Sequence, residues 1–274
     1  MVEDGMRTVV IGGGTNGMGR ALTLERAKRG DRVVVLGRNR QRGESLAGGL
    51  VEFLPVDLSS VAETRLAIDE ISARCEVVDA LALFANAVAP ERIETAEGLE
   101  RTFALYYLSR YLLSFGLAPA LERSSSPVIV NVAGVGVTRG SVNWDDPQLT
   151  GRYSMVRAQL QAGRANDLLG VGFAARAGSR ARYVLYHPGF TRSGDRSALP
   201  RVLRGLLAVT AAVAAQPVEK AIGPIQHFVE DPPSEPLIAV DRGRRLPLTL
   251  PTLDPAEAER LMDLTEEILA AARS

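Results

Sequence analysis

Short runs of apolar, β-branched residues alternate with longer helical stretches along most of the chain. The strand-like runs are almost continuously apolar, which is typical of strands buried on both faces of a parallel sheet. This alternation predicts βαβ units and therefore an α/β fold: a Rossmann-type doubly wound parallel sheet of about seven strands with helices on both faces. We expect strands at 7–12, 31–37, 51–57, 77–86, 126–134 and 180–189, and helices at 16–30, 59–73, 98–122 and 151–177.

Beyond Gly189 the alternation becomes looser. Residues 200–215 and 218–230 are expected to be helical, 237–240 to form an edge strand and 255–272 to form an amphipathic helix. No internal repeat or clear linker divides the 274 residues. We therefore expect a single domain over 1–274, in which 190–274 forms a substrate lid and C-terminal region.

The composition argues against several classes of protein. Thirty-two basic and 32 acidic residues cancel, whereas a nucleic-acid partner normally requires a basic face. One cysteine, Cys75, and two distant histidines, His187 and His227, argue against a metal site, and His187 is interpreted as structural. The acidic N-terminus carries no secretory signal, and no apolar run is long enough to span a membrane. We expect a cytoplasmic protein with no membrane partner.

A glycine-rich loop, GGGTNGMGRA at 12–21, lies directly between the first expected strand and the first expected helix. Glycines at this junction let backbone amides approach a pyrophosphate at the helix N-terminus, where the helix dipole also favours an anion. The position, context and spacing together predict a nucleotide-binding site. Its expected phosphate-binding residues are Gly13, Thr15, Asn16, Gly17, Met18 and Gly19.

The end of the second expected strand indicates which dinucleotide the loop binds. A carboxylate at this point would bind the ribose hydroxyls of NAD(H), but the sequence reads LGRNRQR at 36–42 and has none. The planar guanidinium of Arg38 is suited to a 2′-phosphate. We therefore predict NADP(H) as the cofactor, in preference to NAD(H).

With these motifs, the chain resembles the short-chain dehydrogenase/reductase family over nearly its whole length. The glycine motif, the Asp57-Leu58 pair after the third strand and the Pro188-Gly189 loop all match that family. The segment 142–169 looks most like the retinol-dehydrogenase and protochlorophyllide-reductase branch. The resemblance implies further cofactor contacts from Asp57, Leu58, Asn86, Ala87, Pro188, Gly189 and Ser193.

The family's chemistry uses a tyrosine that transfers a proton, a lysine four residues later, a serine that binds the substrate carbonyl, and an asparagine on the preceding long helix. The resemblance places Tyr153 at the tyrosine and Arg157 at the lysine, both on one face of the expected helix. Gly134 stands where the serine belongs, and Tyr106 at about the asparagine position. Tyr153, Arg157 and Tyr106 are the predicted catalytic residues, with Tyr153 and Arg157 also contacting the cofactor.

This altered set leaves three hypotheses open. The first is an NADP(H)-dependent oxidoreductase acting on a small, rather apolar carbonyl or alcohol substrate. The second is a non-redox enzyme on the same scaffold, such as a cyclase, isomerase or dehydratase. The third is a catalytically inactive NADP(H)-binding protein. As in relatives, we expect a homo-oligomer, with 98–122 and 151–177 forming the interface of a dimer.

Overall fold

A computed structural model describes residues 5–136, 140–189 and 217–272 of the chain. Its centre is one eight-stranded sheet in the order β3-β2-β1-β4-β5-β6-β7-β8, in which all neighbours are parallel except β7 and β8. The strands are β1 Thr8–Gly12, β2 Arg32–Gly37, β3 Val51–Pro55, β4 Ala80–Leu83, β5 Val128–Val132, β6 Arg182–His187, β7 Leu237–Asp241 and β8 Arg244–Leu246. The predicted doubly wound α/β fold is confirmed.

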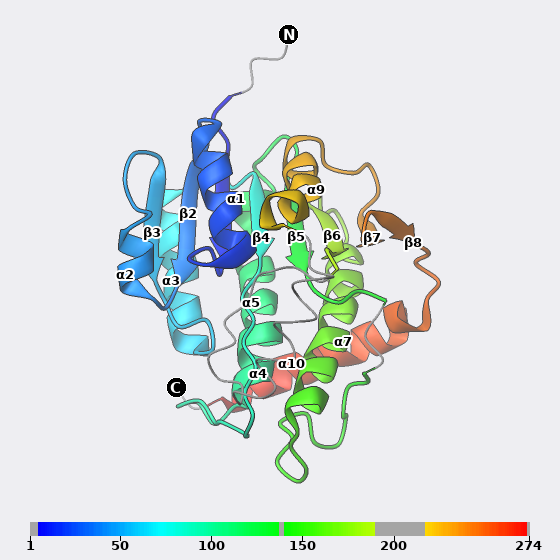
Figure 1. Ribbon diagram of the computed structural model, residues 1–274. Coiled ribbons are helices and arrows are strands. Elements are labelled where there is room, and N and C mark those ends of the chain that lie inside the picture. The colour runs from blue at the N-terminus through cyan, green and yellow to red at the C-terminus, as the bar shows by residue number, and fades with distance from the viewer. Residues whose placement is uncertain (1–4, 137–139, 190–216, 273–274) are drawn as a thin grey trace.

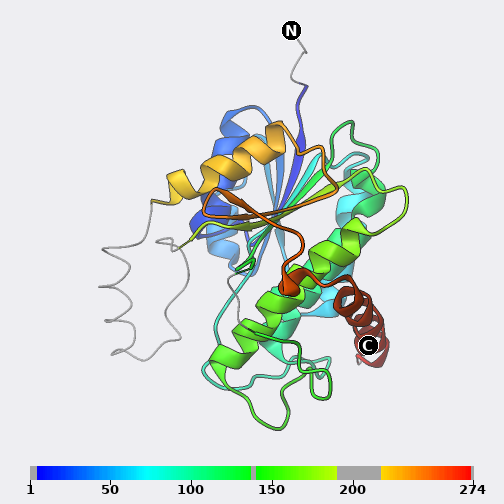
Figure 2. The ribbon, with the colours of Figure 1, turned by 90° about the vertical axis from the view of Figure 1, so that its right-hand side faces the viewer.

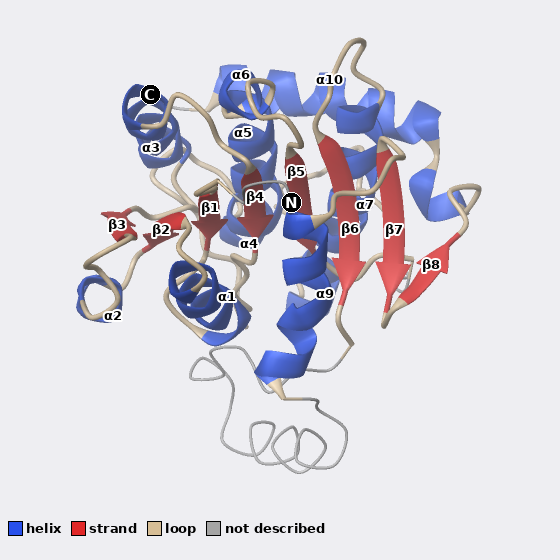
Figure 3. Ribbon diagram, turned by 90° about the horizontal axis from the view of Figure 1, so that it is seen from above, coloured by secondary structure: helices blue, strands red, loops and turns tan. Residues whose placement is uncertain are grey.

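Helices cover both faces of this sheet (Figures 1 and 3). One face carries α1 Gly17–Lys28 and α9 Val218–Glu230, packed on the apolar side chains of one core. The other carries α3 Val61–Arg74, α5 Ser109–Gly116 and α7 Met155–Ala174 over a larger core. The remaining helices are α2 Arg40–Glu44, α4 Arg101–Phe103, α6 Ala118–Leu121, α10 Pro255–Ala271, the π-helical turn η1 Ala104–Leu108 and the 3₁₀ turn η2 Pro251–Leu253.

The strand order reverses between β1 and β4, and this reversal positions the site. The end of β1 at Gly12 pairs with Leu36 of β2 on one side and Leu83 of β4 on the other. After β1 the chain continues to β2 on one side of β1 and later returns to β4 on the other side. This reversal opens a crevice at the carboxyl ends of the strands.

Three sequence-based expectations about the elements are wrong in detail. The helix expected over 98–122 is divided into α4, η1, α5 and α6, because a π-helical turn and then Pro119 interrupt the regular bonding. The segment 237–240 is not an edge strand, since β8 pairs with β7 and forms the edge. The helix expected over 151–177 begins only at Met155. The helix predicted over 200–215 lies outside the described residues.

The C-terminal helix α10 lies across the outer side of the layer that contains α5 and α7 (Figures 2 and 3). Its Thr265 is hydrogen-bonded to the Tyr107 hydroxyl of η1 at 2.6 Å, and its Leu261 is fully buried. A dimer through α5 and α7 would have to form beside or displace α10, and the homo-oligomer stays a prediction. No helix in the described part of the chain has the length and apolar character needed to cross a membrane.

Candidate nucleotide-binding cleft

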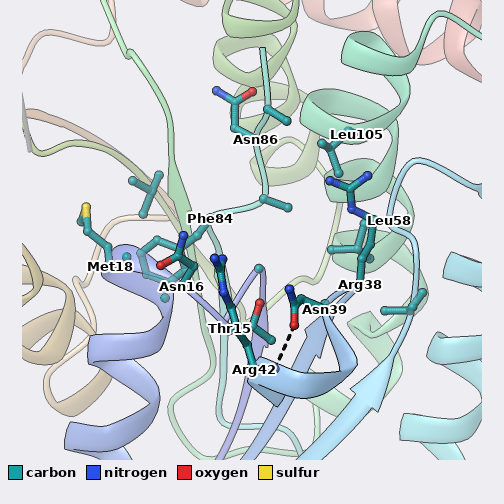
Figure 4. Close-up of a pocket in the computed structure, with 18 of the residues that line it drawn as sticks. Thr15, Asn16, Met18, Arg38, Asn39, Arg42, Leu58, Phe84, Asn86 and Leu105 are labelled. Atoms are coloured by element: carbon teal, nitrogen blue, oxygen red, sulfur yellow. Dashed lines mark hydrogen bonds between the residues drawn. The ribbon is translucent and has the colours of Figure 1, made fainter. Parts of the chain in front are cut away.

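A cleft of about 820 Å³ opens along the carboxyl ends of the parallel strands, at the point where the strand order reverses (Figure 4). Residues at or just beyond the ends of six different strands contribute to its wall, together with Leu105 of η1. Its lining residues are Gly13, Thr15, Asn16, Gly17, Met18, Gly19, Gly37, Arg38, Asn39, Arg42, Val56, Leu58, Phe84, Ala85, Asn86, Ala87, Val88, Leu105, Val132 and Pro188. All six residues of the predicted phosphate-binding loop are among them.

The glycine loop is held close to the sheet by backbone contacts. The amides of Gly13 and Gly14 donate to Leu36 O of β2 at 2.9 and 3.3 Å. A Cβ on Gly19 would lie 2.3 Å from Gly13 O, so that α1 can start this close to β1 only with glycine here. Asn16, the N-cap of α1, makes no side-chain cap hydrogen bond. The first amides of α1 therefore remain available to an anion in the cleft.

Two arginines border the cleft beyond β2, where the sequence predicted one. Arg38 is half exposed, and its Nη1 lies 3.9 Å from Asp57 Oδ2, so it is only loosely paired. Asn39 begins α2 by accepting a hydrogen bond from the Arg42 amide at 2.8 Å, and this turn brings Arg42 to the cleft wall. Arg42 was not among the predicted cofactor contacts, although Asn39 was an available signal that a helix starts here.

Only some of the other predicted cofactor contacts lie on the cleft wall. Leu58, Asn86, Ala87 and Pro188 line the cleft. The Asp57 carboxylate is turned into its own loop, where Oδ1 accepts from the amide and hydroxyl of Ser59 at 2.9 and 2.7 Å. Gly189 follows Pro188 with a φ of +84°, a conformation that favours glycine. Ser193 lies outside the described residues.

Tyr153 and Arg157 do not line the cleft, and the prediction that they share one face of a helix is wrong. Ser154 is the N-cap of α7 and accepts from the Arg157 amide, so Tyr153 precedes the helix and shares no helical face with Arg157. The Tyr153 hydroxyl donates to Ala89 O at 2.8 Å. The exposed guanidinium of Arg157 donates to Arg152 O at 3.2 Å. Neither residue lines the cleft.

The residue of α7 that does reach the cleft wall is Gln159. Its amide pairs reciprocally with that of Asn86, at 3.0 and 3.2 Å, and its Nε2 donates to Ala87 O at 2.9 Å. Gly163 is buried one turn further along the same face of the helix. The spacing that the family resemblance assigns to tyrosine and lysine is therefore occupied, on the face toward the cleft, by Gln159 and Gly163.

Tyr106 lies below the cleft, at the end of β5. Its ring stacks on the guanidinium of Arg110, one turn further along the helix, with 4.7 Å between the ring centroid and Cζ. The fully buried Arg110 donates to Val132 O at 2.9 Å, to Ala85 O at 3.0 Å and to the Asn131 side chain. Burial raises the pKa of Tyr106, although the charge of Arg110 and a hydrogen bond with the Gly134 backbone oppose the shift. The phenol beside a fixed cation that the sequence placed at Tyr153 is found here instead.

The fold and the cleft define a Rossmann-type α/β protein with a glycine-loop site at its topological switch point. The family model for short chain dehydrogenases matches residues 7–145. The chain belongs to this short-chain dehydrogenase/reductase family of oxidoreductases.

Three similar proteins illustrate the relationship. The chain is 26% identical to dehydrogenase/reductase SDR family member 12 of Bos taurus, over 96% of this chain and 86% of that protein. It is 29% identical to human retinol dehydrogenase 12, over 68% of this chain and 62% of that protein. A crystal structure of a protein from Mycobacterium paratuberculosis has the same fold, with a TM-score of 0.75 at 24% identity, covering 96% of this chain and 93% of that one. The predicted proximity to the retinol-dehydrogenase branch is confirmed.

Proposed function

We propose that this protein binds NADP(H) in the cleft and acts as an oxidoreductase on a small, rather apolar carbonyl or alcohol compound. The observation that carries the proposal is one continuous wall that joins the uncapped start of α1 to Arg38 and Arg42. The helix start suits a pyrophosphate and the two guanidinium groups suit a 2′-phosphate. Membership of an oxidoreductase family supports hydride exchange, which is the chemistry that the bound dinucleotide supplies.

We propose that the Tyr106 hydroxyl donates a hydrogen bond to the substrate oxygen. Its contact with the Gly134 backbone puts it where the family resemblance expects the serine. Burial keeps the phenol protonated, so it can donate a hydrogen bond, and Arg110 beneath its ring favours negative charge nearby. Apolar side chains of Leu105 and Val132 on the adjoining wall favour an apolar substrate.

A second candidate function is binding of NADP(H) without turnover. Gly134 stands where the family resemblance expects the serine, and Gln159 and Gly163, which have the tyrosine–lysine spacing on the helix face toward the cleft, carry no ionisable side chain. Loss of NADPH absorbance with a panel of apolar aldehydes and ketones would support the oxidoreductase. Tight NADPH binding without such loss would support the binder, and turnover of a substrate with the cofactor unchanged would indicate the non-redox alternative.

Arg38→Ala and Arg42→Ala are each expected to weaken NADPH binding by about tenfold to a hundredfold, because each removes a charge-assisted contact to the 2′-phosphate. NADH affinity should change little. Calorimetry with NADPH, NADH and adenosine 2′,5′-bisphosphate checks this, since the bisphosphate reports on the adenosine half alone. Arg40→Ala is the matched control, because Arg40 is exposed in the same turn and does not line the cleft. Equal wild-type affinities for NADPH and NADH would contradict the proposal.

Tyr153→Phe is expected to leave both NADPH affinity and any turnover unchanged within about twofold, because the lost hydroxyl binds Ala89 O and not the cleft. Were Tyr153 the catalytic acid, turnover would fall by about 10²–10⁴-fold. Gln159→Ala, in contrast, removes the amide contacts to Asn86 and Ala87 and should weaken NADPH binding by about threefold to tenfold. Measuring both variants side by side decides whether Tyr153 or Gln159 belongs to the site.

A further inference from the structure

We propose that His187, held by Asp241, is the group that exchanges a proton with the substrate oxygen at the nicotinamide end of the cleft. The inference rests on the proposed binding of NADP(H). The sequence alone favoured a structural role for His187 and indicated none for Asp241.

The two side chains come from directly opposed positions at the carboxyl ends of neighbouring strands. His187 is the last residue of β6 and stands opposite Asp241, the last residue of β7. Their Nδ1 and Oδ1 atoms are 2.7 Å apart. The His187 side chain is 24% exposed, so solvent has access to the ring, and the Asp241 side chain is 14% exposed. The pair is therefore both fixed and accessible.

The carboxylate defines which ring nitrogen exchanges the proton. Burial acts to raise the pKa of Asp241, but hydrogen bonds from Arg242 and His187 outweigh it and keep the pKa below its ordinary value. An ionised carboxylate only accepts, so Nδ1 donates to it and Nε2 is the nitrogen left for exchange. A base oriented by a third group in this way is a recurring arrangement for proton transfer. Arg242, which binds Asp241 Oδ2 at 3.0 Å, is the other charged group in contact with the pair in the described part of the chain.

The direction in which a dinucleotide lies in the cleft puts this pair near the nicotinamide. Arg38 and Arg42 fix the adenosine ribose beyond β2, and the start of α1 fixes the pyrophosphate. The second half must then lie over the ends of β4, β5 and β6, where Asn86, Val132 and Pro188 line the wall. Pro188 directly follows His187, so the end of β6 that carries this histidine adjoins the wall there.

Other ionisable groups in this region are less suited to the task. Tyr153 is bonded to Ala89 O, away from the cleft. Asp167 is completely buried behind the β5–α7 loop, with Oδ2 accepting from the Gly136 amide at 3.3 Å, so it exchanges no proton with solvent directly. Tyr106 is almost fully buried as well. Within the described ranges, His187 is the partly exposed imidazole near this end, a side chain that can both donate and accept a proton.

In the reductive direction, the carbonyl oxygen gains negative charge as its carbon accepts the hydride that NADPH supplies. That oxygen takes the proton from Nε2–H of the His187 imidazolium: the N–H bond breaks, an O–H bond forms, and the imidazole is left neutral. The exposed ring then regains a proton from solvent. Hydride and proton together account for the two hydrogens of the alcohol, and no other reactant is needed.

The chain has two histidines, which makes a direct test possible by NMR of their ring signals across pH. We expect the His187 titration midpoint to lie about half a unit to one unit lower with NADP⁺ bound than with NADPH bound. The oxidised ring carries one more positive charge, and a unit charge about 8–10 Å away has an effect of this size. His227 should titrate identically in both complexes, because α9 carries it to the opposite edge, where Arg7 donates to Val229 O.

Two variants complete the test. His187→Gln assigns the signals and should lower any turnover by at least tenfold while NADPH affinity stays within about threefold. Asp241→Asn keeps the ring but removes the carboxylate, and should lower the His187 midpoint in both complexes. Identical His187 midpoints with NADP⁺ and NADPH, in a protein that calorimetry shows to bind both, would overturn the inference. Absence of binding in calorimetry would instead overturn the proposed function.

Discussion

Gly19→Ala is expected to abolish measurable NADPH binding and to destabilise the fold by about 1–3 kcal/mol. The new Cβ would stand 2.3 Å from Gly13 O and 3.0 Å from Gly14 Cα, and neither backbone atom has room to withdraw. The start of α1 must then move away from the glycine loop, which separates the amides that are to hold the pyrophosphate. Calorimetry with NADPH and a thermal melt measure the two effects.

Gly223→Ala is the matched control for this substitution. Gly223 lies inside α9, and a Cβ there would have nothing within 4 Å. The higher helix propensity of alanine is opposed by the following Pro224, whose ring disfavours a helical residue with a Cβ before it, so stability should change by less than about 1 kcal/mol, with NADPH affinity unchanged. A Gly19→Ala protein with wild-type melting temperature and wild-type affinity would show that the loop and α1 do not need their close approach.

The fold and the phosphate end of the site were predictable because both depend on local sequence. Strands buried on both faces require continuous apolar runs, as in TVVIG of β1 and VIVNV of β5, and these runs are visible without any neighbour. The glycine loop must be glycine-rich because backbone passes backbone there: a Cβ on Gly13 would lie 2.7 Å from Ala85 N. Steric requirements of this kind determine the residue types directly, so they can be recognised in the sequence.

The catalytic end of the site was less predictable, because which residues reach it depends on where their side chains point and not only on their spacing in the sequence. Tyr153 and Arg157 have the spacing of a helical pair, but the helix begins after Tyr153. The signal was present in Ser154, whose side chain caps α7 by accepting from the Arg157 amide at 3.2 Å. A capping serine directly after the tyrosine places that tyrosine outside the helix, and the face toward the cleft then starts from Gln159.

Long-range pairs were not visible in the sequence at all. His187 and Asp241 are 54 residues apart and meet only because β6 and β7 are neighbours in register. Tyr106 and Arg110 are only four residues apart, but Tyr106 lies in η1, a π-helical turn inside what the pattern indicated as one regular helix. The extra residue of a π-turn changes which side chains share a face, and apolar periodicity does not report it.

Asp167→Asn is expected to make the protein more stable at pH 8 and to flatten its stability between about pH 4 and 7. Asp167 is completely buried in α7, and this burial raises the pKa of its carboxyl to about 7, although the hydrogen bond from the Gly136 amide and the charge of Arg164 oppose the shift. Between the ordinary carboxyl pKa and about 7, the folded state therefore holds a proton that the unfolded state has lost. Wild-type stability must fall as the pH rises through this window, by up to a few kcal/mol.

Asparagine removes the titration and keeps a carbonyl oxygen that can accept from the Gly136 amide at the place of Oδ2. Denaturant unfolding of both proteins at several pH values between 5 and 8 measures the difference. Asp69→Asn, at an exposed position of α3, is the control for the change in net charge, and its curve should run parallel to that of the wild type. If the Asp167→Asn protein were instead the less stable one at pH 8, the attraction between an ionised Asp167 and Arg164 would outweigh the burial of the charge. The carboxylate would then be an ion-pair partner that holds the β5–α7 loop, because Oδ2 accepts from Gly136 within that loop.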